Sequence, residues 1–400
     1  MEPPSDNRVG THVQGRHVHA VNFHENDFDY EEYASTLCFP EAPPSSSSAS
    51  LAEVAAWRAE NGDDAAAWDA FYRREANANP YRSRRYLIAE FPELLRPTRG
   101  APHGLSSWLP PWLTSAPPLL FDVGCGYGSA LMPLLRANPR LQAVAVDLSP
   151  TAVGRLKEHL NDRALFPASD RRRVRARPWD ITKGLPPPFR EADAAKGDAT
   201  KGDATKGDDA KGDGAELEHA DLALLVFTLS AIDPSCHAAV LRRLRAALRP
   251  GSGTILFRDR ARYDLTMIRA SEDQRLGEST YAREDGTLAH YFTAREVELL
   301  AAEAGLEVVD AHGDASEARY CTVRLRNRRK GTDMHRCFVE ARLRRPMRRP
   351  SPPAMPPADG SARGLSSGRR LLLAVAAVVV ASAAAVVVAG RRRRLTAARR

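Results

Sequence analysis

Three glycines at alternate positions follow an acidic residue in the run 119–128, which reads LLFDVGCGYG. Glycines so placed let the backbone approach a ligand closely and take φ angles that a Cβ forbids. A second apolar run, 143–146, ends in Asp147 about twenty residues later, at the place where α/β folds hydrogen-bond the hydroxyls of a ribose. Gly124, Gly126, Gly128 and Asp147 therefore predict a site for a ribose-containing ligand.

The spacing of these glycines separates two kinds of ligand. A dinucleotide site uses G-x-G-x-x-G, in which the pyrophosphate lies on a helix N-terminus. The pattern here is D-x-G-x-G-x-G, which suits a pyrophosphate poorly and resembles the cofactor loop of S-adenosylmethionine-dependent methyltransferases. The alternative is a glycine-rich turn in some other α/β domain.

Alternating strands and helices must position this loop. Strand and helix patterns alternate along the centre of the chain, which predicts a parallel sheet with helices on both faces. The expected strands lie near 118–123, 141–147, 173–178, 220–227 and 252–258, with two further candidates at 306–309 and 336–343. The expected helices lie at 128–137, 151–160, 235–248 and 294–304.

Composition narrows the class of protein. The 400 residues carry a formal net charge of +8, which favours an acidic partner such as RNA or an anionic membrane surface. The five cysteines are an odd number, widely spaced and without a C-x-x-C pair. This cysteine usage argues against a disulfide framework and predicts a reducing compartment. It also argues against a zinc site, so no bound metal is expected.

The C-terminal region contains a candidate membrane span. Residues 371–389 are all Leu, Ala and Val except Ser382, and arginines at 369–370 and 391–394 flank them. About 20 apolar residues cross a bilayer core, and flanking cations reach the headgroups. We expect a single-pass tail anchor over 371–390 with the catalytic domain in the cytosol; the membrane itself is left open.

Several further motifs follow one another along roughly residues 65–345. They are WDAFY at 68–72, AEFPEL at 89–94, the glycine loop, DLSP at 147–150, WDIT at 179–182, FTLSAI at 227–232, LFRD at 256–259, DGT at 285–287 and YFT at 291–293. In this order they resemble the methyltransferase-like enzymes that make N3-methylcytidine in tRNA anticodon loops. The sequence departs from that family at Arg260-Ala261, where Tyr-Gly is usual, and at Thr280, where an aromatic is usual.

This resemblance implies a fold and a set of cofactor contacts. The fold is a Rossmann-like class I methyltransferase with a mostly parallel seven-stranded sheet, an N-terminal helical cap and a C-terminal transmembrane helix. The implied cofactor is S-adenosyl-L-methionine and the implied partner is tRNA, with any protein that selects the tRNA unknown. The implied cofactor-binding residues are Trp68, Tyr72, Gly124, Gly126, Gly128, Asp147, Asp180, Ile181 and Val226.

The implied roles of these residues differ. Trp68 and Tyr72 contact the cofactor from the N-terminal helix, Gly124 lies against its amino-acid moiety, and Asp147 takes the ribose. Asp180 meets the adenine amino group, with Ile181 and Val226 packing on the ring. From the residues alone, Asp180 is equally a helix cap.

Methyl transfer from a sulfonium to cytosine N3 needs placement of the two reactants more than a strong base. The product base is cationic, so a nearby carboxylate can stabilise the developing charge. Asp259 and Asp264 are the catalytic candidates, and Arg258 is either a third or a structural partner of one of them. The basic runs 171–173, 324–330 and 342–349 are candidates for RNA phosphate contact, each with a solvated face as the alternative.

The expected organisation follows from these observations. Residues 196–215 are four pentapeptides of the KGDAT type, which cannot bury a core. Two other functions stay open: a methyltransferase of the same fold acting on a protein or small molecule, and a non-catalytic membrane-tethered RNA-binding protein. The expected segments are a disordered region at 1–60, a helical cap at 61–115, a methyltransferase domain at 116–345 with a low-complexity insert at 191–216, a Pro/Arg-rich linker at 346–370, the anchor at 371–390 and a basic tail at 391–400.

Overall fold

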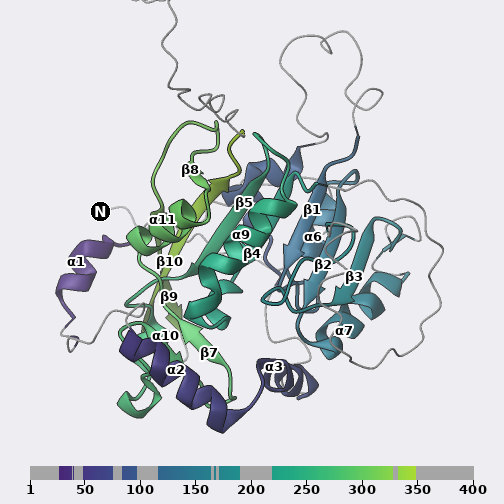
Figure 1. Cartoon of the computed structure of the whole chain (residues 1–400). Helices are drawn as coiled ribbons and strands as arrows, with labels where there is room; N and C mark the ends of the chain where they lie inside the picture. The colour runs from purple at the N-terminus through teal and green to yellow at the C-terminus, as the bar shows by residue number, and fades with distance from the viewer. Residues whose placement is uncertain are drawn as a thin grey trace, which may run out of the picture. The chain divides into compact units, whose positions relative to one another are not determined.

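The computed structural model describes residues 27–37, 39, 48–74, 83–96, 116–163, 166–167, 171–189, 219–327 and 332–347 (Figure 1). The chain divides into two compact units, residues 1–348 and 349–400, and all described residues belong to the first. The predicted insert at 191–216 lies outside the described residues, as do the anchor and the basic tail. Within the described residues, no helix combines the length and the apolar character that a membrane crossing requires.

A mostly parallel sheet forms the centre of the first unit. The parallel strands are β1 (Leu119–Val123), β2 (Gln142–Asp147), β3 (Val174–Pro178), β4 (Leu222–Val226) and β5 (Thr254–Arg260), in the order β3-β2-β1-β4-β5. β10 (Thr332–Arg344) then pairs antiparallel with β5 and with β8 (Glu307–Val309). The strand order reverses between β1 and β4, and open α/β sheets bind ligands at that point.

Within the described residues the sheet has eight strands, so the predicted number of seven is wrong. The missed strand is β9 (Arg319–Asn327), which pairs antiparallel with β10. The end of β9 overlaps the basic run 324–330, which was predicted to contact RNA phosphates. The backbone partner that makes it a strand comes only with the tertiary fold.

Helices cover both faces of the sheet, as the alternation of elements predicts (Figure 1). α6 (Leu131–Ala137) and α7 (Pro150–Asn161) pack with one core cluster, and α9 (His237–Ala247) and α11 (Ala294–Glu303) pack with the other. β1 and β4 are buried along their whole length, because a parallel strand between two helical layers is covered on both faces.

Helices also form in the N-terminal region, where the sequence predicted disorder over 1–60. α1 (Tyr30–Ser35) and α2 (Ser48–Asn61) correct that prediction for their own residues. Tyr30 stacks on Tyr320 of β9 with ring centroids 3.5 Å apart, and Val54 of α2 is 1% exposed. Both helices obtain their burial from residues far along the chain, which local composition does not reveal.

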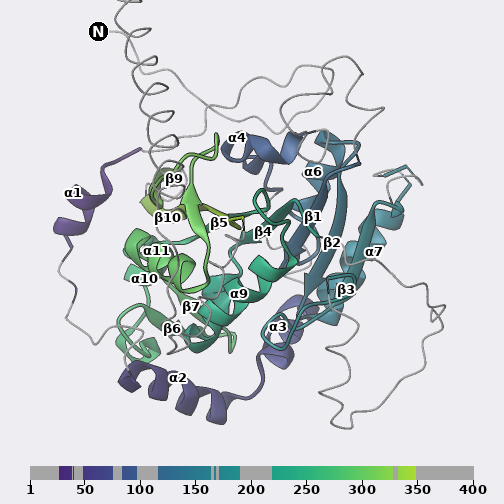
Figure 2. The same ribbon diagram turned by 45° about the horizontal axis from the view of Figure 1, so that its top comes forward.

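The remaining elements lie around the ends of the sheet. α3 (Asp64–Arg73) follows α2 directly, and α4 (Leu87–Glu90) leads into the short 3-10 helix η2 (Pro92–Leu95). Figure 2 shows α2 beside β6 and β7, and α3 toward α7. The others are the 3-10 helices η4 (Leu229–Ala231), η5 (Pro234–Cys236) and η6 (Glu272–Gln274), the helix α10 (Leu265–Ile268), and the antiparallel pair β6 (Thr280–Ala282) and β7 (Leu288–His290).

Candidate active site

The glycine loop leaves the carboxyl end of β1 and packs against the loop after β4. Gly124 has φ +71°, and a Cβ on it would lie 2.3 Å from the hydroxyl oxygen of Thr228. Thr228 is held there because its hydroxyl donates to the Val123 carbonyl at 2.9 Å. The preceding residue, Phe227, has φ +55°, a costly conformation for a bulky side chain. Only glycine fits at position 124.

Asp147 lies directly beside this loop. Its carboxylate accepts the backbone N–H of Gly126 at 2.8 Å through one oxygen and that of Ser149 at 2.9 Å through the other. The side chain is 8% exposed, and burial raises its pKa to about 6. Each carboxylate oxygen has a lone pair to spare, so the group is rigidly placed to accept two vicinal hydroxyls. The residues therefore fit a ribose-bearing cofactor.

Helix α3 brings the predicted aromatic residues to the same loop. Tyr72 and Trp68 pack with Tyr127 of the glycine loop, and the Tyr72 hydroxyl lies 2.8 Å from where a Cβ on Gly126 would be. The structure thus brings Trp68, Tyr72, Gly126 and Asp147 together at the carboxyl edge of the sheet. Gly128 closes the loop, where φ +93° again requires glycine.

Asp69 is a positioning residue that the sequence analysis missed. One of its carboxylate oxygens accepts from the Ser149 hydroxyl at 2.7 Å and from the Thr151 backbone N–H at 3.0 Å. These bonds attach α3 to the start of α7, immediately after Asp147. The sequence signal for this role is that Asp69 lies between Trp68 and the other aromatic residues of the same helix. A buried polar residue on an apolar helix face needs a hydrogen-bond partner.

Asp122 is a second missed residue, next to the last residue of β1. Its side chain is buried, and its Oδ2 has no hydrogen-bond partner among the described residues. Burial raises its pKa to about 7; Arg84 acts to lower it and Asp147 to raise it. A buried carboxylate with one unpartnered oxygen beside the glycine loop fits a cationic group such as the ammonium of an amino-acid moiety. The sequence signal for this role is that Asp122 is the first residue of the D-x-G-x-G-x-G pattern.

Asp122 predicts a pH dependence of stability. Between its usual value of 3.8 and its folded value of about 7, the native state holds a proton that the unfolded chain has lost. Stability therefore falls as pH rises through this window, by about 1.4 kcal/mol per pH unit. We expect Asp122→Asn to flatten this slope and to exceed the wild type in stability at pH 8. Urea unfolding without cofactor at pH 5 and pH 8 measures it; parallel slopes in the two proteins would contradict it.

Asp180 occupies a turn after β3. Its Oδ1 accepts from the backbone N–H of Thr182 at 2.9 Å and from the Thr182 hydroxyl at 2.6 Å, and Lys183 lies 3.2 Å from its other oxygen. Burial acts to raise its pKa, and the bonds from Thr182 and Lys183 outweigh burial and lower it. These bonds close a turn at 181–183 and no helix begins there, so the helix cap that the residues alone suggested is not present. Contact with adenine stays a prediction.

Ile181 and Val226 do not lie in one apolar cluster. Ile181 is 6% exposed and belongs to the cluster under α9, whereas Val226 is 7% exposed and belongs to the cluster under α6 and α7. Val226 is the last residue of β4 and Ile181 follows the end of β3, so both lie at the carboxyl edge of the sheet. Their shared contact with an adenine ring stays a prediction.

Arg258 is a buried structural residue in this conformation. Its side chain is 4% exposed and donates to Glu90 at 2.5 Å, and it also pairs with Glu340 of β10. The predicted structural partners were Asp259 or Asp264, and that prediction is wrong. Ligand atoms of Glu90, Glu340 and Cys321 lie within 4.8 Å of one another, and the two carboxylates share the Arg258 guanidinium, while Glu340 also pairs with Arg319 at 2.8 Å.

Asp259 and Asp264 are fully buried as well. Asp259 accepts the backbone N–H of Ser230 at 3.0 Å and that of Arg260 at 2.8 Å. Asp264 caps α10 by accepting from Thr266, and it also pairs with Arg336 at 2.8 Å. Each carboxylate therefore ties one loop at the carboxyl edge to its neighbours. Their catalytic role stays a prediction.

Two of the predicted RNA-binding runs contain arginines that hold the fold. Arg173 donates to the carbonyls of Leu135, Asn138 and Leu141 around the end of α6. In the run 342–349, Arg342 donates to Glu93 at 2.5 Å and Arg345 donates to the Ala246 carbonyl at 3.0 Å near the end of α9. In the remaining run, Arg324 pairs with Asp333 at 2.8 Å and is 55% exposed.

The reversed strand order, the glycine loop and the buried Asp147 define the chain as a Rossmann-like methyltransferase. Comparison with known families agrees, because a methyltransferase domain model matches residues 83–311. The chain belongs to this methyltransferase domain family.

Named relatives add detail about similar proteins. The chain is 28% identical over 290 residues to the human tRNA N(3)-cytidine methyltransferase METTL6, covering 71% of this chain and 81% of the human protein. It is 29% identical over 284 residues to the tRNA N(3)-methylcytidine methyltransferase Mettl2 of Drosophila melanogaster, covering 70% and 71%. A solved methyltransferase from Anabaena variabilis aligns with a TM-score of 0.44 at 13% identity, covering 71% of this chain and 96% of that one.

Proposed function

We propose that this protein is an S-adenosylmethionine-dependent methyltransferase that forms N3-methylcytidine in the anticodon loop of tRNA. The observation that carries the cofactor is Asp147, held by Gly126 and Ser149 beside Tyr72. The relatives named for tRNA N3-cytidine methylation support the acceptor, since they align over about seven-tenths of the chain. The basic charge of the chain agrees with a nucleic-acid partner.

When bound, S-adenosylmethionine supplies an electrophilic methyl group on a sulfonium. Asp147 would accept the ribose hydroxyls, Asp122 would pair with the ammonium, and Trp68 and Tyr72 would cover the cofactor and exclude water. Neutral cytosine N3 carries its own lone pair, so the protein contributes mainly alignment, which is worth up to ~7–11 kcal/mol. N3 lies on the pairing edge, so an unpaired loop nucleotide is the accessible substrate.

The test is methyl transfer by the full-length chain from labelled cofactor into total tRNA, followed by nucleoside mass analysis. Label in N3-methylcytidine is the expected result. Cofactor binding with no label in RNA would redirect the assignment to a protein or small-molecule acceptor. Absence of cofactor binding would instead leave a non-catalytic RNA-binding protein.

We also propose that residues 371–390 anchor the protein in a membrane with the catalytic domain in the cytosol. The support is the apolar run of Leu, Ala and Val with arginines at both flanks. Carbonate extraction of membranes from cells that express the full chain or residues 1–368 tests this. The full chain is expected in the membrane pellet and the shorter chain in the supernatant; recovery of both in the supernatant would refute the anchor.

A further inference from the structure

A sharp elbow joins α2 to α3 at the edge of the candidate site. Gly62 forms the bend with φ +90°, and its backbone N–H donates to the Arg58 carbonyl at 2.9 Å. Asp63 then caps α3 by accepting from the Ala65 N–H at 3.3 Å. The two helices leave this elbow toward different parts of the fold, with α2 beside β6 and β7 and α3 toward α7 (Figures 1 and 2).

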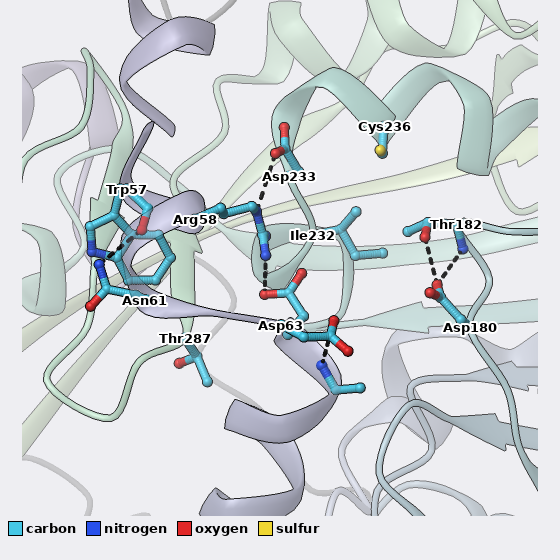
Figure 3. Close-up of polar contacts among 12 residues, drawn as sticks. Trp57, Arg58, Asn61, Asp63, Asp180, Thr182, Ile232, Asp233, Cys236 and Thr287 are labelled. Carbon is cyan, nitrogen blue, oxygen red and sulfur yellow. Dashed lines mark hydrogen bonds and ion pairs between the residues drawn. The ribbon is translucent and has the colours of Figure 1, made fainter. Parts of the chain in front are cut away.

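Arg58 crosses the inside of the elbow. Its guanidinium pairs with Asp64 in the first turn of α3. Its Nε also donates to Asp233 at 3.2 Å (Figure 3). The three side chains are between 19% and 24% exposed. The charges also suit the helices, because Arg58 lies in the last turn of α2 and Asp64 in the first turn of α3.

Asp233 belongs to the same loop that supports the glycine turn. The loop begins after β4 with Phe227 and Thr228, and Thr228 lies against Gly124. Ser230 in its middle is fixed to Asp259 by a 3.0 Å hydrogen bond. Asp233 ends this stretch and caps η5 by accepting from Ser235 through its Oδ1, which leaves Oδ2 for Arg58. Arg58 therefore connects the elbow to a loop that contacts the cofactor turn at its other end.

α2 is itself firmly seated. Val54 is 1% exposed and packs with Leu276 and Leu288, and Trp57 packs on the same cluster. Ser50 lies so close to Gly277 that a Cβ there would be 2.8 Å from its hydroxyl. α2 thus provides a fixed base from which Arg58 can hold α3.

We infer that Arg58 is a positioning residue that holds the aromatic helix α3 over the cofactor by pairing simultaneously with Asp64 and Asp233. This inference rests on the proposed function for its cofactor, though not for its acceptor. Arg58 pairs with two side chains of the protein, so its effect on the cofactor is indirect and passes through α3. Trp68 and Tyr72 of α3 pack with the glycine loop. The geometry assigns cofactor affinity, rather than the chemical step, to this cluster.

The experiment compares S-adenosylhomocysteine binding by the full chain and its variants in calorimetry. Arg58→Ala is expected to raise the dissociation constant about tenfold, with Arg58→Lys between it and the wild type. The matched control is Arg242→Ala, which removes the exposed Arg242–Glu303 pair between α9 and α11 and should leave the affinity unchanged. An unchanged affinity in Arg58→Ala, or an equal loss in Arg242→Ala, would overturn the inference.

A double-mutant cycle guards against a general loss of folding. Asp233→Asn keeps the Oδ1 cap of η5 and removes the charge that Arg58 pairs with. In the double variant, the losses of affinity are expected to be less than additive, because both changes break the same contact; fully additive losses would count against the inference. At saturating cofactor, methyl transfer by Arg58→Ala should stay within about twofold of the wild type, with the loss in the cofactor KM.

This design separates the two proposals. Binding of S-adenosylhomocysteine does not depend on the acceptor. A wild-type chain that binds S-adenosylhomocysteine but fails to methylate tRNA would refute the proposed acceptor. The comparison of cofactor affinity between the wild type and the Arg58 variants would still test the role of Arg58.

Discussion

Replacing Asp147 by alanine is expected to abolish detectable methyl transfer while leaving the chain folded. The change removes an acceptor for the ribose and also the bonds that hold the N–H groups of Gly126 and Ser149. Charged hydrogen bonds contribute about 1.5–3 kcal/mol each, so the loss of two ribose contacts weakens cofactor binding by about two to four orders of magnitude. Calorimetry with S-adenosylhomocysteine and labelled methyl transfer measure the two effects.

A matched control for Asp147→Ala lies beside β8, the strand at the opposite edge of the sheet from β3. Asp310 follows β8, and its carboxylate likewise accepts two backbone N–H groups, from His312 at 2.8 Å and from Asp314 at 2.9 Å. Asp310→Ala should bind cofactor like the wild type. Retention of cofactor affinity in Asp147→Ala would show that the ribose is bound elsewhere.

Arg258→Ala is expected to give the second large effect, on stability. Glu90 and Glu340 would keep their buried carboxylates without the cation that both now contact. Removing one partner of a buried ion pair typically costs about 3–5 kcal/mol. Urea unfolding of Arg258→Ala and of the exposed-pair variant Arg242→Ala measures the difference, and the control should change by less than about 1 kcal/mol.

A compensated variant separates this structural role from the predicted catalytic one. Combining Arg258→Met with Glu90→Gln and Glu340→Gln removes all three charges and should recover most of the lost stability. Methyl transfer by that variant near the wild-type rate would exclude Arg258 from catalysis. A stable but inactive triple variant would restore Arg258 as a catalytic candidate.

The parts of the fold that the sequence predicted well are those with strong local signals. β1, β2, β4 and β5 appear within a few residues of their predicted positions, because central parallel strands are continuous apolar runs. The helices α7, α9 and α11 were confirmed for a similar reason, since each shows one apolar face at helical spacing. The glycine loop and Asp147 were predicted because a ligand-binding turn needs residue types that local structure alone does not favour.

Other features depended on partners far away in the sequence. Strand β9 is defined by pairing with β10, and α1 by stacking of Tyr30 on Tyr320. Asp259 and Asp264 are catalytic candidates from the sequence, and the structure shows that both are fully buried and bonded to neighbouring loops. Local patterns do not report such pairing, because the energy comes from groups brought together only after the chain has closed.

The sequence by itself determined the order of the central strands and helices and the cofactor turn, since backbone conformation and apolar periodicity are local properties. Only the tertiary structure decided what the charged residues do. It placed Arg258 between Glu90 and Glu340, Asp69 at the start of α7, and Arg58 between Asp64 and Asp233. The local sequence does not specify which partner a charged side chain will pair with. A charged side chain that becomes buried needs a partner, because an unpaired buried charge is costly.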